Sequence, residues 1–207
     1  FAVRMVLAQT AEKSLDVQYY IWRADLTGTL FFAALLAARD RRVRVPLLLD
    51  DNGTFGLDTM LAALDAHADI EVRLFNPFMI RSPPAIGYLT HFFRVNRRMH
   101  NKSFTADNQA TVIGGRNVGD EYFDAAGEGA LVFADLDVLA VGAVVRDVSR
   151  EFDRYWVSAS AYPVDRVLPI ATQEAAAEIR TAASLAEPDP RAAAYLGAIR
   201  DSKIVAG

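Results

Sequence analysis

Residues 1–75 alternate between short apolar segments and longer stretches with a helical pattern. Residues 15–22 (LDVQYYIW), 42–51 (RVRVPLLLDD) and 70–75 (IEVRLF) are rich in β-branched and aromatic residues, which is typical of strands. The stretches between them carry apolar residues every three or four positions, which predicts helices. This β-α-β-α-β order with short connections predicts an α/β fold, with a mixed, largely parallel sheet sandwiched by helices.

Further signals set the other expected elements. A helix is expected over residues 3–13, and the helix that follows the first strand begins with Thr27 or Thr29 as its N-cap. A later strand is expected over residues 131–141, and the long helix after it ends near Trp156.

The composition changes near Tyr162, and the rest of the chain is rich in Ala, Glu and Arg with the breaker EPDP at 187–190. We therefore expect an α/β domain over residues 1–160 and a helical linker over 161–207. Because the sequence begins already in helical rhythm, we expect it to be a piece of a longer protein.

The overall composition excludes several classes of protein. The chain has 207 residues, a net charge of −4 and a pI near 5.4, so no global basic field favours nucleic acid. It contains no cysteine, which excludes disulfides and thiolate metal sites. The longest apolar run, LTGTLFFAALLAA, is too short to cross a bilayer.

The segment HNKSFTADNQATVIGGRN, which begins at residue 100, predicts a β-hairpin. Strands over 98–106 and 109–117 would be joined at Asp107 and Asn108, a pair well suited to a tight turn. With a two-residue turn, the numbers of opposed residues sum to 215.

This register would bring unusual polar residues together. His100 would face Gly115, Lys102 would face Ile113, and Asn117 would lie diagonally beside His100. A neutral imidazole can act as a nucleophile, while a lysine and an asparagine amide donate hydrogen bonds to phosphate oxygens. Such a patch suits the charge that develops on a phosphoryl group in transfer.

The segment resembles the HxKxxxxD…G(G/S)xN signature of the phospholipase D superfamily. Other segments, including LLLDD, EVRLFNPF, RRMHNKSF, GGRNVGDEYF and FDRYW, resemble the cardiolipin-synthase-like branch of bacterial phospholipase D proteins. The resemblance covers residues 1–165, and the tail resembles the linker between the two halves of such proteins. The six positions at the family spacing are His100, Lys102, Asp107, Gly114, Gly115 and Asn117.

The resemblance implies a two-step transfer that needs no cofactor and no metal. His100 would attack a phosphodiester to form a phosphohistidine, a second histidine would protonate the leaving alcohol, and water or another alcohol would then resolve the intermediate. Lys102 and Asn117 would hold the phosphoryl oxygens, with Gly114 and Gly115 beside the substrate. Asp107 is an odd number of residues from His100 and lies at the turn, so its side chain would be off the reactive face. It would orient the hairpin.

The resemblance also implies partners and a place in the cell. The substrates would be anionic phospholipids such as phosphatidylglycerol, reached by a bacterial protein peripheral to the cytoplasmic membrane. The second phospholipase D-like half would come from the same full-length chain or from a homodimer, and no nucleic acid is expected.

Two alternative functions stay open: a homodimeric phosphodiesterase of the same superfamily that acts on nucleic acid, and a non-catalytic scaffold. In many relatives Ser or Thr stands at the position of Gly115, so a hydroxyl donor is missing here.

Other polar residues carry weaker signals. His67 resembles a solvated helix end, and His91 in an aromatic loop is interpreted as structural. Asp50 and Asp51 end a strand where α/β sheets often place ligands. Asp120 and Glu121 would either tune His100 or begin a helix.

The irregular segment 76–99 leaves two questions open, each with two possible answers. Arg94, Arg97 and Arg98 either attract lipid phosphates or lie in a solvated loop. The apolar residues either form a lip that faces lipid or pack under the loop. These apolar residues are Phe78, Met79, Ile80, Tyr88, Phe92 and Phe93.

Overall fold

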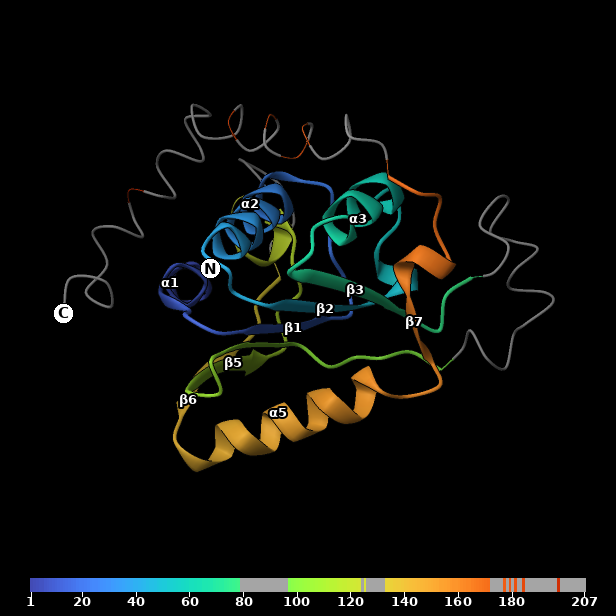
Figure 1. Cartoon of the computed structure of the whole chain (residues 1–207). Coiled ribbons are helices and arrows are strands. Elements are labelled where there is room, and N and C mark those ends of the chain that lie inside the picture. Colours follow the sequence, from blue (N-terminus) through green and yellow to red (C-terminus); the bar gives the residue numbers. More distant parts are fainter. Residues whose placement is uncertain are drawn as a thin grey trace.

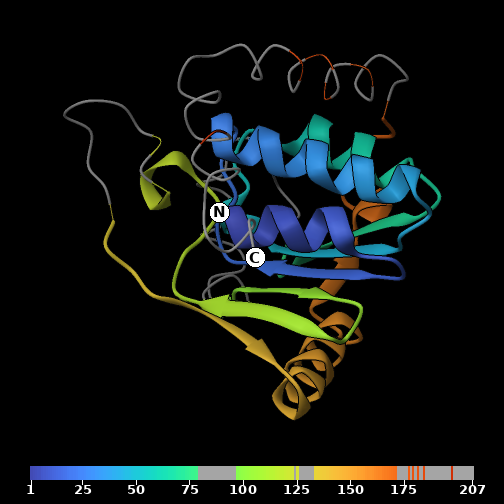
Figure 2. The same ribbon diagram turned by 90° about the vertical axis from the view of Figure 1, so that its left-hand side faces the viewer.

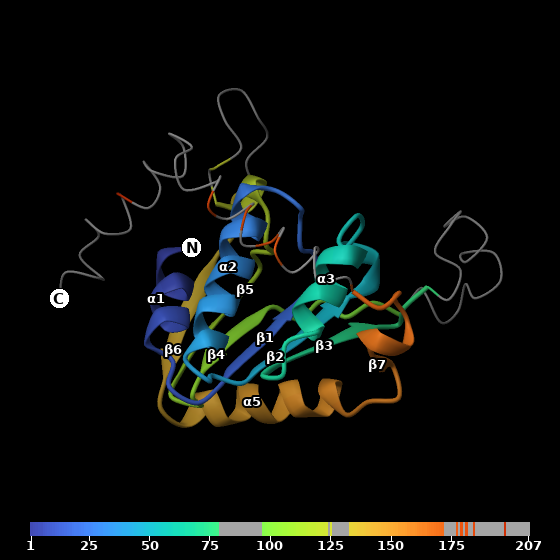
Figure 3. The same cartoon turned by 45° about the horizontal axis from the view of Figure 1, so that its top comes forward.

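The computed structural model describes residues 1–78, 97–123, 125 and 133–171, together with positions 177, 179, 181, 184 and 197. In this part of the chain, seven strands form one sheet in the order β6-β5-β4-β1-β2-β3-β7 (Figure 3). The strands are β1 (Leu15–Tyr19), β2 (Val45–Asp50), β3 (Ile70–Phe75), β4 (Ser103–Ala106), β5 (Ala110–Gly114), β6 (Asp137–Val141) and β7 (Ala161–Pro163).

Helices cover both faces of this sheet. The helices α1 (Ala2–Thr10), α2 (Leu26–Asp40) and α3 (Asp58–Asp65) lie on one face, and α5 (Ala143–Trp156) crosses the other (Figures 1 and 2). Every residue of β1 and β2 is buried, as expected for central strands covered on both sides. The largest fully buried side chains include Trp22, Tyr19, Phe31, Phe32 and Phe104.

The predicted mixed α/β class is confirmed, and the pairings define it more closely. Parallel pairing joins β1 to β2 and β2 to β3, where α2 and α3 provide the crossovers. The pairs β1–β4, β4–β5, β5–β6 and β3–β7 are antiparallel. "Largely parallel" therefore describes only the centre of the sheet.

The predicted hairpin is present, but its register was wrong by one residue. Asp107 and Asn108 both have positive φ, at 53° and 56°, as expected of a tight turn. Gln109 also belongs to the loop, so that Ala106 pairs with Ala110 and Ser103 with Ile113. Because the ladder ends at Ser103, the predicted pairs of His100 with Gly115 and of Lys102 with Ile113 do not form.

Other boundaries also differ from those predicted: β6 begins at Asp137 rather than at residue 131, and α1 ends at Thr10 rather than at residue 13. Helix α2 is capped by Asp25, whose carboxylate accepts a hydrogen bond from the Gly28 N–H, and not by a threonine. The residues just beyond 160 also contact the sheet: β7 pairs with β3, and both Val164 and Leu168 lie in the hydrophobic core. The strand is too short to show a period in the sequence.

Candidate active site

His100 lies just before β4, against the residue that follows β1. Its ring stacks on Tyr20 with centroids 3.8 Å apart and planes at 24°. The residue is otherwise exposed. Partial desolvation of the ring, and secondarily the charge of Lys102, lower the pKa of His100. A lowered pKa favours the neutral imidazole near pH 7, the form in which a histidine is a nucleophile.

Lys102 contacts the same two residues. Its Nζ donates a hydrogen bond of 2.6 Å to the backbone oxygen of His100, and lies 5.6 Å from the centre of the Tyr20 ring. Burial lowers the pKa of Lys102, and the carboxylate of Asp135 opposes that shift. An ammonium group has three donors, so the bond to His100 leaves two for an anion beside the imidazole.

Asn117 is joined to this patch by a hydrogen bond with the backbone next to Tyr20. Its side chain is buried, and its Oδ1 accepts a hydrogen bond of 3.0 Å from the N–H of Ile21, the neighbour of Tyr20. Its Nδ2 donates to the hydroxyl of Tyr122 at 3.0 Å. The structure therefore joins His100 and Asn117 to the consecutive residues Tyr20 and Ile21. One of the two amide hydrogens of Asn117 is already engaged.

Asp107 lies in the hairpin loop and fixes that loop against the chain before β1. Its carboxylate accepts the backbone N–H groups of Glu12, Lys13 and Ser14 at 2.7–2.8 Å. Burial alone would raise the pKa of Asp107, but these hydrogen bonds lower it. Such contacts orient the hairpin and involve no group of the His100 patch.

The two glycines of the motif allow a close approach of the chain just before β6. A Cβ atom on Gly115 would lie 2.0 Å from a carboxylate oxygen of Asp135, and one on Gly114 would lie 2.3 Å from the backbone oxygen of Leu136. The N–H of Gly115 donates to that same oxygen at 3.0 Å. The carboxylate of Asp135 thus occupies the space that a side chain at position 115 would take.

Sequence reasoning missed Tyr20 and Asp135. No spacing rule connects either residue to the HxK motif, because only the pairing of β1 with β4 and the path of the chain before β6 bring them close. The only local hint was the aromatic pair Tyr19–Tyr20 at the end of the first strand.

Asp120 and Glu121 have structural partners. Asp120 accepts hydrogen bonds from the N–H and the hydroxyl of Thr27, and so joins the motif to the first turn of α2. Glu121 forms an ion pair with Arg23 at 3.3 Å.

Two residues of segment 76–99 pack against the domain. Phe78 is buried under the guanidinium of Arg98, so Phe78 does not form a lipid-facing lip. Arg98 pairs with Asp50, so Arg98 does not lie in a solvated loop. Arg97 is exposed. His91, Arg94 and the other proposed lip residues lie outside the described residues.

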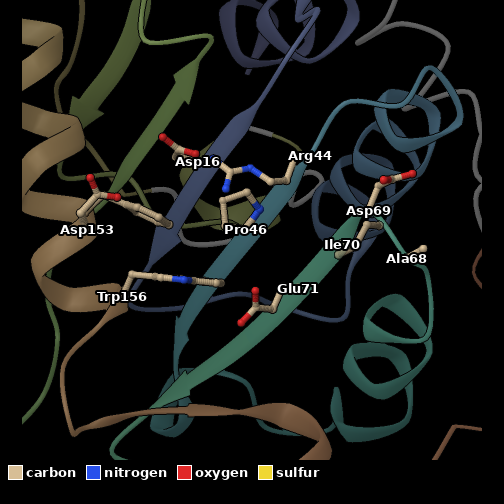
Figure 4. A pocket seen from close by; sticks show the side chains of 10 residues that line it. Asp16, Arg44, Pro46, Ala68, Asp69, Ile70, Glu71, Asp153 and Trp156 are labelled. Carbon is tan, nitrogen blue, oxygen red and sulfur yellow. The ribbon is translucent and has the colours of Figure 1, made fainter.

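A separate hollow of about 160 Å³ lies at the opposite ends of the strands (Figure 4). It is bordered by Asp16 of β1, by Arg44 and Asp69 near the starts of β2 and β3, and by Asp153 and Trp156 of α5. Ligands of α/β sheets generally bind beyond the carboxyl ends of the strands, where Tyr20, Asp50 and His100 lie. We therefore place the candidate active site at His100 and not in this hollow.

Among the described residues, no helix is long and apolar enough to cross a membrane. Nor do three or more His, Cys, Asp or Glu side chains come together there in a way that could hold a metal ion.

Comparison with solved structures identifies the class of fold. NucT from Helicobacter pylori superposes with a TM-score of 0.57 at 12% identity, over 78% of this chain and 88% of that chain. Phosphatidylserine synthase from Haemophilus influenzae Rd KW20 has a TM-score of 0.57 at 14% identity, over 88% and 40%. Nuc from Salmonella typhimurium, a phospholipase D family member, has a TM-score of 0.50 at 16% identity, over 78% and 88%. At these identities the fold alone is shared, and it is that of a phospholipase D-like domain.

Sequence comparison identifies the family within this class. Residues 6–156 match the family described as cardiolipin synthase, PLD-like domain, and the chain belongs to it. Cardiolipin synthase C from Escherichia coli K12 is 57% identical over 184 residues, which is 89% of this chain and 38% of the relative. An uncharacterized protein from Helicobacter pylori 26695 is 40% identical, over 78% and 32%. Cardiolipin synthase B from Escherichia coli K12 is 33% identical, over 67% and 31%. The chain thus spans about a third of the length of these relatives.

Proposed function

We propose that this chain is one half of a phosphatidyltransferase that acts on anionic phospholipids at the cytoplasmic membrane surface. The observation that carries the proposal is the HxK pair itself. His100 has a lowered pKa and an accessible ring, and the ammonium group of Lys102 is hydrogen-bonded to its backbone. The 57% identity to cardiolipin synthase C supports a phospholipid substrate.

In the first step, a ring nitrogen of His100 attacks phosphorus. The P–N bond forms while the bond from phosphorus to the leaving alcohol breaks, and that alcohol takes a proton from a histidine of the second half. In the second step, an acceptor alcohol attacks phosphorus and gives its proton to the same histidine. The P–N bond then breaks and His100 is regenerated.

The other residues of the patch stabilise charge and hold the nucleophile. Two hydrogens of the Lys102 ammonium are directed to phosphoryl oxygens, whose negative charge rises in the transition state. The second amide hydrogen of Asn117 adds a neutral donor. Tyr20, stacked on His100, fixes the plane of the imidazole.

The experiment is turnover of phosphatidylglycerol in mixed micelles by a longer polypeptide that carries this chain and its second half. His100→Ala should lower kcat by about a thousandfold or more, because the covalent route is lost. His67→Ala, a histidine between α3 and β3, serves as the matched control and should leave kcat within about twofold. Equal turnover by His100→Ala and the unsubstituted protein would rule out the assignment.

A further inference from the structure

The chain segments on either side of residues 79–96 lie side by side. The side-chain amide of Asn76 donates to the backbone oxygen of Arg97 at 2.6 Å, and the guanidinium of Arg98 lies 4.8 Å from the centre of the Phe78 ring. Asn76 itself has a positive φ of 46°, which turns the chain sharply after β3.

Two acidic residues at the end of β2 hold these two segments. Asp50, fully buried, accepts the Met99 N–H at 2.8 Å and forms an ion pair with Arg98 at 3.1 Å. Asp51, also buried, accepts the Phe78 N–H at 2.7 Å. A buried carboxylate is tolerated when it is paired and hydrogen-bonded in this way, and such charge-assisted bonds are stronger than neutral ones.

Met99, which precedes His100, is fixed on two sides. Its backbone N–H is bound by Asp50, and its sulfur lies 3.0 Å from the side-chain amide of Gln18 on β1. The residue is 1% exposed. His100 is therefore held from its own N-terminal side by a buried, charged network and from its ring side by Tyr20.

We propose that Asp50 is a positioning residue that sets the place of His100 through Arg98 and Met99. This inference rests on the proposed role of His100 as the nucleophile. Asp50 contacts no reacting atom, and its effect is exerted through the backbone at residue 99. The strand β2 reads VPLLLD and is otherwise apolar. The positioning role explains why this strand ends on a buried charge, because Asp50 binds the two residues that precede His100.

The test is a pH titration of the histidine ring signals by NMR in the labelled 207-residue chain. In Asp50→Asn the pKa of His100 should rise toward its ordinary value of about 6.5, because the ring loosens from Tyr20 and becomes hydrated. Loss of the negative charge alone would shift the pKa in the opposite direction, so a rise indicates displacement of His100. Amide hydrogen exchange at His100 and Asn101 should become about tenfold faster or more.

Asp16→Asn is the matched control. Asp16 is also a buried acid on a central strand, but it lies near the opposite ends of the strands, beside the hollow. This control should leave the titration of His100 unchanged. Arg98→Gln breaks the same ion pair from the other partner, and it tests the positioning role of the Asp50–Arg98 pair if Asp50→Asn does not fold. Unchanged titration and exchange in a folded variant would overturn the inference. Absence of lipid turnover by the longer polypeptide would count against the proposed function instead.

Discussion

At the scale of single residues, two carboxylates near the paired ends of β1 and β4 show how hydrogen-bond partners decide a pKa. Asp107 has three backbone donors and a lowered pKa. Asp16 is more deeply buried than Asp107, and within the described part of the chain no donor bonds to it. Burial raises the pKa of Asp16 to about 6, with Asp153 adding to the shift and Arg44 opposing it.

Asp16→Asn should therefore stabilise the protein at neutral pH. The pKa of Asp16 lies above its ordinary value of 3.8 in the folded chain, so the folded state binds more protons between pH 4 and pH 6. Stability falls as the pH rises through this window, and the loss is complete above it. The substitution should flatten this fall and add at most about 3 kcal/mol at pH 7. Urea unfolding at several pH values measures the effect. Asp147→Asn on the exposed face of α5 is the control, and an unchanged pH slope in Asp16→Asn would contradict the argument.

A second prediction at this scale concerns the binding of an anion beside His100 and Lys102. Lys102→Ala should weaken the binding of sulfate or vanadate about tenfold, because one charge-assisted donor is lost. Perturbation of the His100 ring signal during titration gives the affinity. Lys13→Ala removes an exposed lysine and should have no effect. Equal affinity of the Lys102→Ala and unsubstituted chains would remove Lys102 from the site.

At the scale of elements, the residues after the short strand β7 show that the hydrophobic core continues beyond residue 160. Leu168, which follows β7, is 5% exposed, whereas Ile170 is 94% exposed. Leu168→Ala should lower the free energy of unfolding by about 2–5 kcal/mol through loss of buried surface and a residual cavity. Ile170→Ala should change it by less than about 0.5 kcal/mol. Denaturant unfolding of the two variants decides whether the domain extends beyond residue 160, and equal stabilities would place the boundary earlier.

The same elements show how far the sequence alone could lead. Local periodicity was sufficient to predict β1, β2, β3 and the helices between them, since each carries a clear pattern of apolar residues. It predicted the turn at Asp107, but not the third loop residue that shifts the register. Asp25 caps α2, whereas Thr27 lies inside the helix and its hydroxyl is bound by Asp120, a residue far along the chain. Within the site, the spacing identified His100 and Lys102. Their contacts with Tyr20 and Asp135 depend on tertiary packing, which no local pattern encodes.

At the scale of the whole molecule, the sheet brings one HxK motif to one end of a single domain. In-line displacement at phosphorus requires a nucleophile on one side and a proton donor on the other, and His100 cannot supply both. The sequence holds three histidines, and only His100 has a lysine two positions later. The relatives are about three times as long as the matched region, which leaves room in them for a second such domain.

We therefore expect the 207-residue chain to fold by itself but to turn over phospholipids slowly or not at all. It should unfold cooperatively, because one core connects β1, β2 and β3 with the helices on one face of the sheet. Without a general acid opposite His100, turnover should be lower than that of a longer polypeptide by about a hundredfold or more. The assay compares the two proteins on phosphatidylglycerol, with His100→Ala of each as the control and with the oligomeric state measured in parallel. Robust turnover by a monomeric chain, abolished by His100→Ala, would show that one motif suffices. It would refute the requirement for a second histidine from another half. Turnover that rises with the fraction of dimer would instead place the second histidine on another copy of the chain.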